Sequence, residues 1–251
     1  MRYPRLATWI SWGAIALSVP GLAGAADAPQ GKPIPPIEAQ TKSHPATVAT
    51  PVYRPPTRGV PGGRVGGGTR GTDQTFVLSV LAPNHVGLTT QEQPAMYWYL
   101  SKAISTPIEF TLIDDQSIKP ILAITLSPPF QAGVHRIRLA DHEIRLLPGR
   151  LYQWFVALVM DGDHRSRDIL AGGTIERREP PDTLSAQLGK AGASAALLYA
   201  GAGFWYDALA AVSDQIDVGQ SDPALWRQRA SLLEQVGLTE IAEYDKRAAD
   251  R

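Results

Sequence analysis

Residues 53–71, YRPPTRGVPGGRVGGGTRG, place seven glycines and four arginines within 19 positions. Guanidinium groups bind phosphate, sulfate and carboxylate through forked hydrogen bonds, and glycine-rich backbone can form concave rows of N–H groups around an anion. Arg58, Arg64 and Arg70 are therefore candidate anion-binding residues, for which a sulfated or phosphorylated envelope glycan would be a suitable ligand. The alternative, which we favour, is a strap along the folded body whose arginines pair with acids there. In both cases the glycines predict backbone that a Cβ would obstruct.

A nucleotide-binding loop is a third interpretation, because Gly66 to Gly71 matches G-x-G-x-x-G. That motif needs a strand before it and a helix after it, so that the helix N-terminus meets the pyrophosphate. Here a proline-rich segment precedes the glycines and an apolar strand pattern follows them. A Walker loop is also excluded, because no lysine lies between positions 43 and 101. The sequence thus predicts no nucleotide and no cofactor.

Other chemical motifs are weak. The chain has neither H-E-x-x-H nor G-x-S-x-G, and its five histidines are scattered. Asp161, Asp163 and Asp168 only loosely resemble a calcium loop, because the terminal glutamate is missing, and a solvated hairpin turn fits them better. Tyr97, Trp98 and Tyr99 could line a sugar-binding face, but aromatic strands more often belong to a core. We therefore predict no catalytic residues and no metal site.

Composition limits the function classes further. Basic and acidic residues balance at 24 each, and cysteine is absent, which excludes disulfides and thiolate metal sites. Cleavage after Ala25 would remove two arginines and no acid, which leaves a formal charge of −2. Such a charge does not suit general nucleic-acid binding.

The N-terminus has the pattern of a signal peptide, residues 1–25. Arg2 and Arg5 precede the apolar run Leu6–Leu22, and Ala23-Gly24-Ala25 provides small residues for cleavage. The run is interrupted and near the short limit for a membrane span, so we expect export without a stable span, while a retained anchor stays open as an alternative. Residues 26–52 are proline-rich and polar, which predicts a disordered linker before the strap, residues 53–74.

Residues 75–179 contain seven strand patterns separated by turn residues, with no helical segment between them. They lie at 75–83, 94–100, 107–114, 119–127, 133–140, 150–160 and 168–178. Ile108, Phe110 and Leu112 alternate with polar residues, and Trp154 lies in a central apolar strand. This pattern predicts an antiparallel β-sandwich of immunoglobulin-like architecture, with Trp154 in its core.

Residues 182–251 have a helical period, which makes the predicted fold α+β. Several small or apolar residues recur after 34 positions, among them Gly203 and Gly237, and Ala196 and Ala230. A 34-residue period is that of the tetratricopeptide helix pair, so we predict a tetratricopeptide-like tail that packs on the sandwich or on a partner. An ordinary helical cap with coincident alanines is the alternative.

Three stretches carry a resemblance to a known family: the run from Tyr53 to Gly71, YQWFVALVMDGDHRSRD, and YAGAGFWYDALAAV. Over residues 53–245 the chain resembles the bacterial family catalogued as domain of unknown function 928. The resemblance implies an exported protein with no assigned activity and no catalytic residues to carry over. Where family members often have cysteines, this chain has Thr72-Asp73 and Met160-Asp161, so a disulfide of those members would be absent here.

The leading hypothesis is an exported, non-enzymatic protein, periplasmic or extracellular, whose helical tail binds an envelope protein. Trp205, Tyr206 and Trp226 are candidate contact residues, although each also suits a core. A carbohydrate- or anion-binding module that uses the glycine- and arginine-rich segment is the first alternative. A hydrolase without a recognisable motif is the second alternative.

Overall fold

The computed structural model describes residues 49–56, 63–68, 76–219 and 222–251, all within one compact unit, residues 46–251. The predicted signal peptide and most of the predicted linker lie outside these ranges. Pro51 and Val52, at the end of the predicted linker, are described, and Pro51 is buried. None of the helices in these ranges is long and apolar enough to cross a lipid bilayer.

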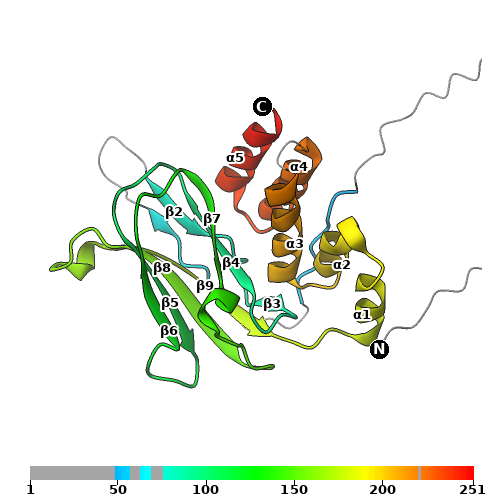
Figure 1. Ribbon diagram of the computed structural model, residues 1–251, viewed down its shortest axis with the longest axis horizontal. Helices are drawn as coiled ribbons and strands as arrows, with labels where there is room; N and C mark the ends of the chain where they lie inside the picture. Colours follow the sequence, from blue (N-terminus) through cyan, green and yellow to red (C-terminus); the bar gives the residue numbers. More distant parts are fainter. Residues whose placement is uncertain (1–48, 57–62, 69–75, 220–221) are drawn as a thin grey trace, which may run out of the picture. The chain divides into compact units, whose positions relative to one another are not determined.

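Nine strands form two sheets within the described ranges. Figure 1 shows these sheets beside the helices. The first sheet has the order β1-β2-β4-β7 and the second β3-β9-β8-β5-β6. The strands are β1 Gly67–Gly68, β2 Val77–Val80, β3 Gly87–Thr89, β4 Ala95–Leu100, β5 Ile108–Asp114, β6 Leu122–Leu126, β7 Gly133–Arg138, β8 Leu151–Leu158 and β9 Ile169–Arg177.

All seven predicted strands are present, and β1 and β3 were missed because two or three residues are too short to show alternation. The prediction of a fully antiparallel arrangement is wrong for β3, which pairs in parallel with β9. Alternation is confirmed in β5, where Ile108, Phe110 and Leu112 are buried beneath the sheet and the residues between them are half-exposed. The side chains of both sheets meet in a single core that contains Trp154.

In the described part of the chain, five α-helices follow the strands, and short 3-10 turns occur at Leu139–His142, Arg165–Arg167 and Gly192–Ser194. The helices are α1 Asp182–Leu188, α2 Ala195–Gly201, α3 Trp205–Val218, α4 Pro223–Gln235 and α5 Thr239–Ala249. α4 begins where it does because the Asp222 carboxylate caps the N–H of Ala224 and Pro223 occupies the first turn. The turns between α2 and α3 and between α4 and α5 contain Gly203 and Gly237, whose φ values are +85° and +74°.

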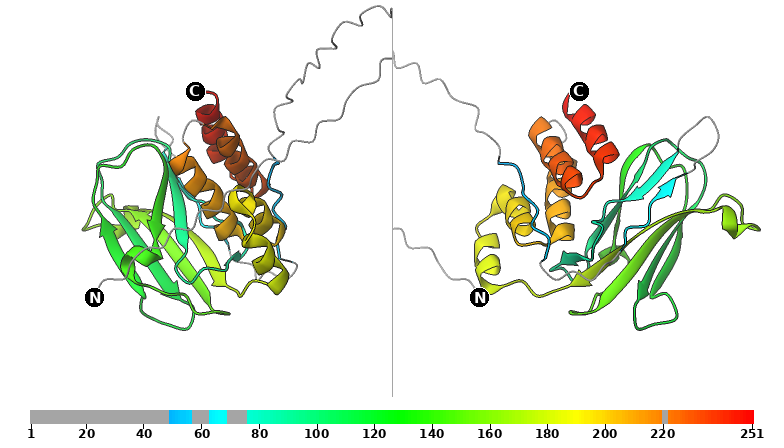
Figure 2. Two further views of the ribbon diagram at one scale, coloured as in Figure 1. Left: turned by 45° about the vertical axis from the view of Figure 1, so that its right-hand side comes forward. Right: turned by 180° about the vertical axis from the view of Figure 1, so that it is seen from behind.

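The four-stranded sheet lies between the five-stranded sheet and helices α3, α4 and α5, as Figures 1 and 2 show from several sides. This position explains why β4 is buried on both faces, including Tyr97 and Tyr99. The ring of Tyr99 packs edge-on against Tyr244 of α5, with centroids 5.4 Å apart. The helices and the sheets share one core, so the predicted helical tail does not have a separate one.

One edge of the two sheets is connected by residues 65–68. Val65 pairs with Gly172 of β9 in the five-stranded sheet, with both backbone hydrogen bonds at 2.9 Å. Two residues later, β1 pairs with β2 of the four-stranded sheet. The strap therefore bridges the sheets at the β2 and β9 edge, and β6 and β7 end the sheets on the opposite side.

Candidate functional site

Arg64 is the described member of the predicted anion-binding group, while Arg58 and Arg70 lie outside the described residues. Its Nη1 donates to the carbonyl oxygens of Ala82, at 3.0 Å, and Val236, at 3.2 Å. Burial lowers the pKa of this guanidinium. Arg64 thus connects the strap both to the end of β2 and to the turn between α4 and α5.

The strap glycines in the described part do not meet the predicted obstruction. A Cβ placed on Gly63 or Gly66 would meet no atom within 4 Å. The close approach occurs instead at Gly203, where a Cβ would lie 2.8 Å from the carbonyl oxygen of Arg54. The glycine that the fold needs here is therefore the helix-turn glycine, and the strap is the segment packed against it.

The predicted contact residues Trp205 and Tyr206 are buried within this chain, at 0% and 1% exposure. Trp205 Nε1 donates to the Leu81 carbonyl oxygen at 2.9 Å. The Tyr206 hydroxyl accepts from Trp154 Nε1 and donates to the carbonyl oxygen of Thr174, both at 2.9 Å. These two residues attach the helices to the sheets, which matches their alternative interpretation as core.

Trp226, the third predicted contact residue, is half-buried on α4. The guanidinium of Arg229 lies 5.0 Å from the centroid of its ring, within cation–π range. Arg229 is itself buried in a forked ion pair with Asp245 of α5, at 2.7 and 2.8 Å. Trp226 therefore covers an ion pair that joins α4 to α5.

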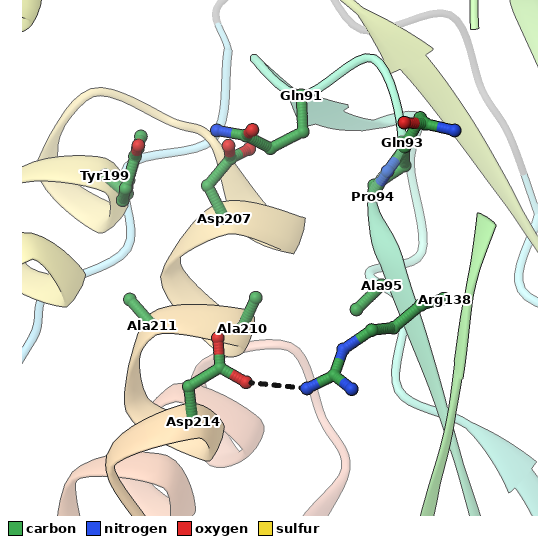
Figure 3. A pocket seen from close by; sticks show the side chains of 10 residues that line it. All are labelled: Gln91, Gln93, Pro94, Ala95, Arg138, Tyr199, Asp207, Ala210, Ala211 and Asp214. Carbon is green, nitrogen blue, oxygen red and sulfur yellow. Dashed lines mark ion pairs between the residues drawn. The ribbon is translucent and has the colours of Figure 1, made fainter. Parts of the chain in front are cut away.

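A cleft of about 290 Å³ lies between α3 and the start of β4, and we call it the α3 cleft (Figure 3). Its floor is formed by small side chains, and amide, charged and phenolic groups surround them. The lining residues are Gln91, Gln93, Pro94, Ala95, Arg138, Tyr199, Asp207, Ala210, Ala211 and Asp214. The cleft thus combines residues from α2, α3, the segment before β4 and the end of β7.

Asp207 is the most buried charged residue of the α3 cleft, at 4% exposure. Its Oδ2 accepts from the Thr90 backbone N–H at 3.0 Å, and its Oδ1 accepts from the Thr90 hydroxyl at 2.6 Å. Burial raises the pKa of this carboxyl, and the hydrogen bonds from Thr90 partly oppose the rise. Both oxygens are therefore used to hold the 89–91 segment against the first turn of α3.

The other end of the cleft is formed by Arg138 and Asp214, whose charged groups are 3.7 Å apart, as the dashed line in Figure 3 marks. Asp214 also accepts from Arg136 at 2.8 Å. Between the two ends, Ala210 and Ala211 present only methyl groups from α3. The arrangement offers hydrogen bonds over a small apolar floor and leaves room for a main chain to lie close.

A second cleft, of about 420 Å³, lies on the outer face of the five-stranded sheet. Phe155 and Leu170 form its apolar part, and Arg165 spans its polar rim. Arg165 donates to Glu109 at 2.8 Å and pairs with Asp168 at 2.8 Å. The predicted turn 161–168 is thus fastened to β5 by an ion pair.

No group of three or more histidine, aspartate or glutamate side chains lies together as a metal site would require, within the ranges described. His135 Nε2 donates to the carbonyl oxygen of Gln131 at 2.7 Å, and its ring stacks on Trp98. The α3 cleft was missed from the sequence because its residues come from separate elements and form no motif. The polar pair Gln91 and Gln93, next to a proline before an aromatic strand, was the nearest available signal.

Comparison with known proteins identifies a family. The model described as Domain of Unknown Function (DUF928) matches residues 65–245, and this confirms the resemblance predicted from the sequence. No curated protein matches the chain.

Two solved structures match weakly. The vertebrate membrane protein Astrotactin-2, described as perforin-like, is 12% identical over 70% of this chain, with a TM-score of 0.26. The match covers 36% of that protein. A multi-domain immunophilin from Arabidopsis thaliana is 10% identical over 68% of this chain and 100% of its own, with a TM-score of 0.18. Scores this low support no conclusion about fold or function.

Proposed function

We propose, on the premise that the chain belongs to the DUF928 family, that it is an exported, non-enzymatic envelope protein that binds another protein. The proposed binding site is the α3 cleft. The observation that carries the proposal is the combination of amide side chains and an alanine floor in one cleft between α3 and β4.

An extended polypeptide presents N–H and C=O groups in alternation, and each glutamine amide can both donate and accept. Gln91 already donates to the Thr90 hydroxyl at 3.1 Å, so Gln93 is the better suited of the two amides to bind a main chain. The methyl groups of Ala210 and Ala211 allow such a chain to approach α3 closely, and Arg138 and Asp214 add charged groups of both signs. These features favour a peptide segment over a large apolar ligand.

The state of the charged groups favours binding over catalysis. A general base must have a free oxygen near its substrate, and both oxygens of Asp207 already accept hydrogen bonds from Thr90. The Asp214 carboxylate is likewise engaged, in ion pairs with Arg136 at 2.8 Å and Arg138 at 3.7 Å. We infer that these carboxylates maintain the shape of the cleft.

Finer features of the fold belong to the same proposal. We propose that α2 to α5 form two tetratricopeptide-like units, supported by the 34-residue offset and by the left-handed φ of both Gly203 and Gly237. The first unit is short, because α2 has 7 residues whereas α4 has 13. An immunoglobulin-like sandwich is supported by the shared core around Trp154. Export is supported by the N-terminal sequence pattern alone.

The carbohydrate- or anion-binding function is the second candidate. It depends on Arg58 and Arg70, outside the described residues, and on Arg64, whose Nη1 is already bonded to two carbonyl oxygens. It predicts salt-sensitive retention on an anionic polysaccharide that is lost in an Arg64/Arg70→Ala double variant. A hydrolase is the third candidate and requires titratable groups that converge on a substrate.

The test of the protein-binding function is a pull-down from envelope extract with the full chain and two cleft variants. Ala210→Trp fills the cleft, and Gln93→Ala removes one amide without filling it. Ala186→Trp is the matched control, because Ala186 is exposed on α1 outside the cleft. Deletion of 182–251 is unsuitable, since it would remove Trp205 and Tyr206 from the core.

We expect a partner that is retained by the unaltered chain and by Ala186→Trp, and is reduced by both cleft variants. The complex should then be reconstituted from the two purified proteins. A partner that binds all four proteins equally, or that is lost with Ala186→Trp as well, would refute the cleft as the binding site.

A further inference from the structure

The two lateral edges of the sheets differ in how they are covered. At one edge, β3, Val65 and β1 pair with β9 and β2. At the opposite edge, β6 ends the five-stranded sheet, and no strand in the described part of the chain pairs with its outer side. Figures 1 and 2 show β6 on the side of the sheets away from the helices.

β6 carries no blocking residue within its five positions, although Pro120, Pro128 and Pro129 flank it. Exposed edges are commonly blocked by charged residues, prolines or bulges, because their unpaired N–H and C=O groups otherwise attract another strand. β6 has the sequence LAITL, with no charge and no proline, and all five residues pair regularly with β5. Its open side is therefore a regular, neutral template for a further strand.

The inward side of β6 is also incompletely covered. Leu122, Ile124 and Leu126 pack on the common core but remain half-exposed, in contrast to Ile108 and Phe110 on the neighbouring β5. An added strand with apolar residues at the same alternation would cover this row. A partner strand whose inward residues are large and apolar would therefore suit this row.

We propose that the partner strand is β6 of a second copy, paired antiparallel about a twofold axis at Ile124. This register places Leu122 opposite Leu126, Ile124 opposite Ile124, and Ala123 opposite Thr125 of the other copy. Along β6 the side chains alternate in size as Leu, Ala, Ile, Thr, Leu, and this alternation is the same when the strand is followed in the opposite direction. The inward apolar row therefore continues across the twofold axis. The absence of charge means that no like charges meet across the axis.

The added pairing is confined to the five residues of β6. Pro120, Pro128 and Pro129 flank the strand, and Phe130 pairs with Ile104 of its own chain. A five-residue strand buries little surface, so the dimer should be weak and should dissociate on dilution.

The strand β7, which ends the four-stranded sheet, is less suited to the same pairing. β7 carries His135, Arg136 and Arg138, and the two arginines pair with acids of α3. A second copy placed there would bring arginines together, which is unfavourable. The proposed dimer is therefore specific to β6, and it leaves the α3 cleft open because the cleft lies on the helix side of the sheets.

The experiment is sedimentation equilibrium of the full chain over a wide concentration range. The main variant is Ala123→Lys with Thr125→Lys, at two exposed positions that point away from the core. It places lysines opposite lysines in the dimer. The matching variant is Ala123→Glu with Thr125→Glu, and thermal unfolding of each variant checks that the monomer is intact.

We expect the unaltered chain to shift from one copy to two as concentration rises, and each double variant to remain at one copy. An equimolar mixture of the lysine and glutamate variants should regain the two-copy mass. A chain that remains at one copy throughout, or a lysine variant that still associates, would overturn the proposal. Neither outcome affects partner binding at the α3 cleft, which is tested separately with Ala210→Trp.

Discussion

The hydroxyl of Tyr206 offers the sharpest test of how the helices are fastened to the sheets. It lies at 1% exposure on α3, accepts from Trp154 Nε1 of β8 and donates to the Thr174 carbonyl oxygen of β9, both at 2.9 Å. Tyr206→Phe keeps the ring and removes only this hydroxyl. The variant leaves one buried donor and one buried acceptor without their partner.

The expected cost follows from these two groups. A buried polar group that loses its hydrogen bond costs about 1–3 kcal/mol, so two such groups should lower the free energy of unfolding by roughly 2–6 kcal/mol. No cavity term is added, because the ring is retained. With a urea dependence of about 2 kcal/mol per molar, the midpoint should fall by about 1–3 M.

The assay is urea unfolding followed by tryptophan fluorescence, which reports directly on Trp154 and Trp205 in the shared core. Tyr244→Phe is the matched control, because Tyr244 is a half-buried tyrosine whose ring packs on Tyr99. It should change stability by less than about 0.5 kcal/mol, as surface substitutions usually do. If Tyr206→Phe lowers the free energy of unfolding as little as the control does, with the same urea dependence, the Tyr206 hydroxyl does not stabilise the contact between α3 and the sheet.

Three further predictions concern stability. Arg229→Met should cost about 3–5 kcal/mol because it leaves Asp245, at 0% exposure, without its partner, whereas Arg229→Met with Asp245→Leu should recover most of the loss in denaturant titration. Gly203→Ala should cost about 1 kcal/mol more than Gly237→Ala in the same titration. Both glycines have positive φ, but only at Gly203 would a Cβ meet backbone, at 2.8 Å. Burial raises the folded-state pKa of Asp207, so its contribution to stability is complete below the unfolded pKa of about 3.9 and is lost as pH rises through the folded pKa. In Asp207→Asn the free energy of unfolding should therefore fall less steeply as pH rises. An unchanged dependence on pH would contradict a raised pKa of Asp207 in the folded state.

Local patterns in the sequence were sufficient to predict most of the fold. Each of the seven predicted strands has at least four residues with apolar alternation or a continuous apolar run, and each is present. The alternation of β5 also identified its buried side correctly. β1 and β3 have too few residues for a pattern, and the parallel pairing of β3 depends on where the chain lies in space.

The candidate site could not be predicted in the same way. Asp207, Gln91 and Arg138 come from three elements, and only the packing of α3 on the β4 sheet brings them into one cleft. The burial of Trp205 and Tyr206 could not be separated from a contact role by their residue types, because an aromatic residue with a polar tip suits both a core and an interface. Their hydrogen bonds to Leu81 and Thr174 decide between the two.

The strap explains why the two edges of the sheets can behave differently. Tyr53 of the strap is buried in the common core, while Val65 and β1 supply backbone groups to β9 and β2 and so satisfy one edge of each sheet. Val65 and β1 lie on that side, and no strand within the described residues pairs with the outer side of β6. Residues 65–68 thus cover the sheets at β9 and β2, which is why we place the proposed second copy at β6, the uncovered end of the five-stranded sheet.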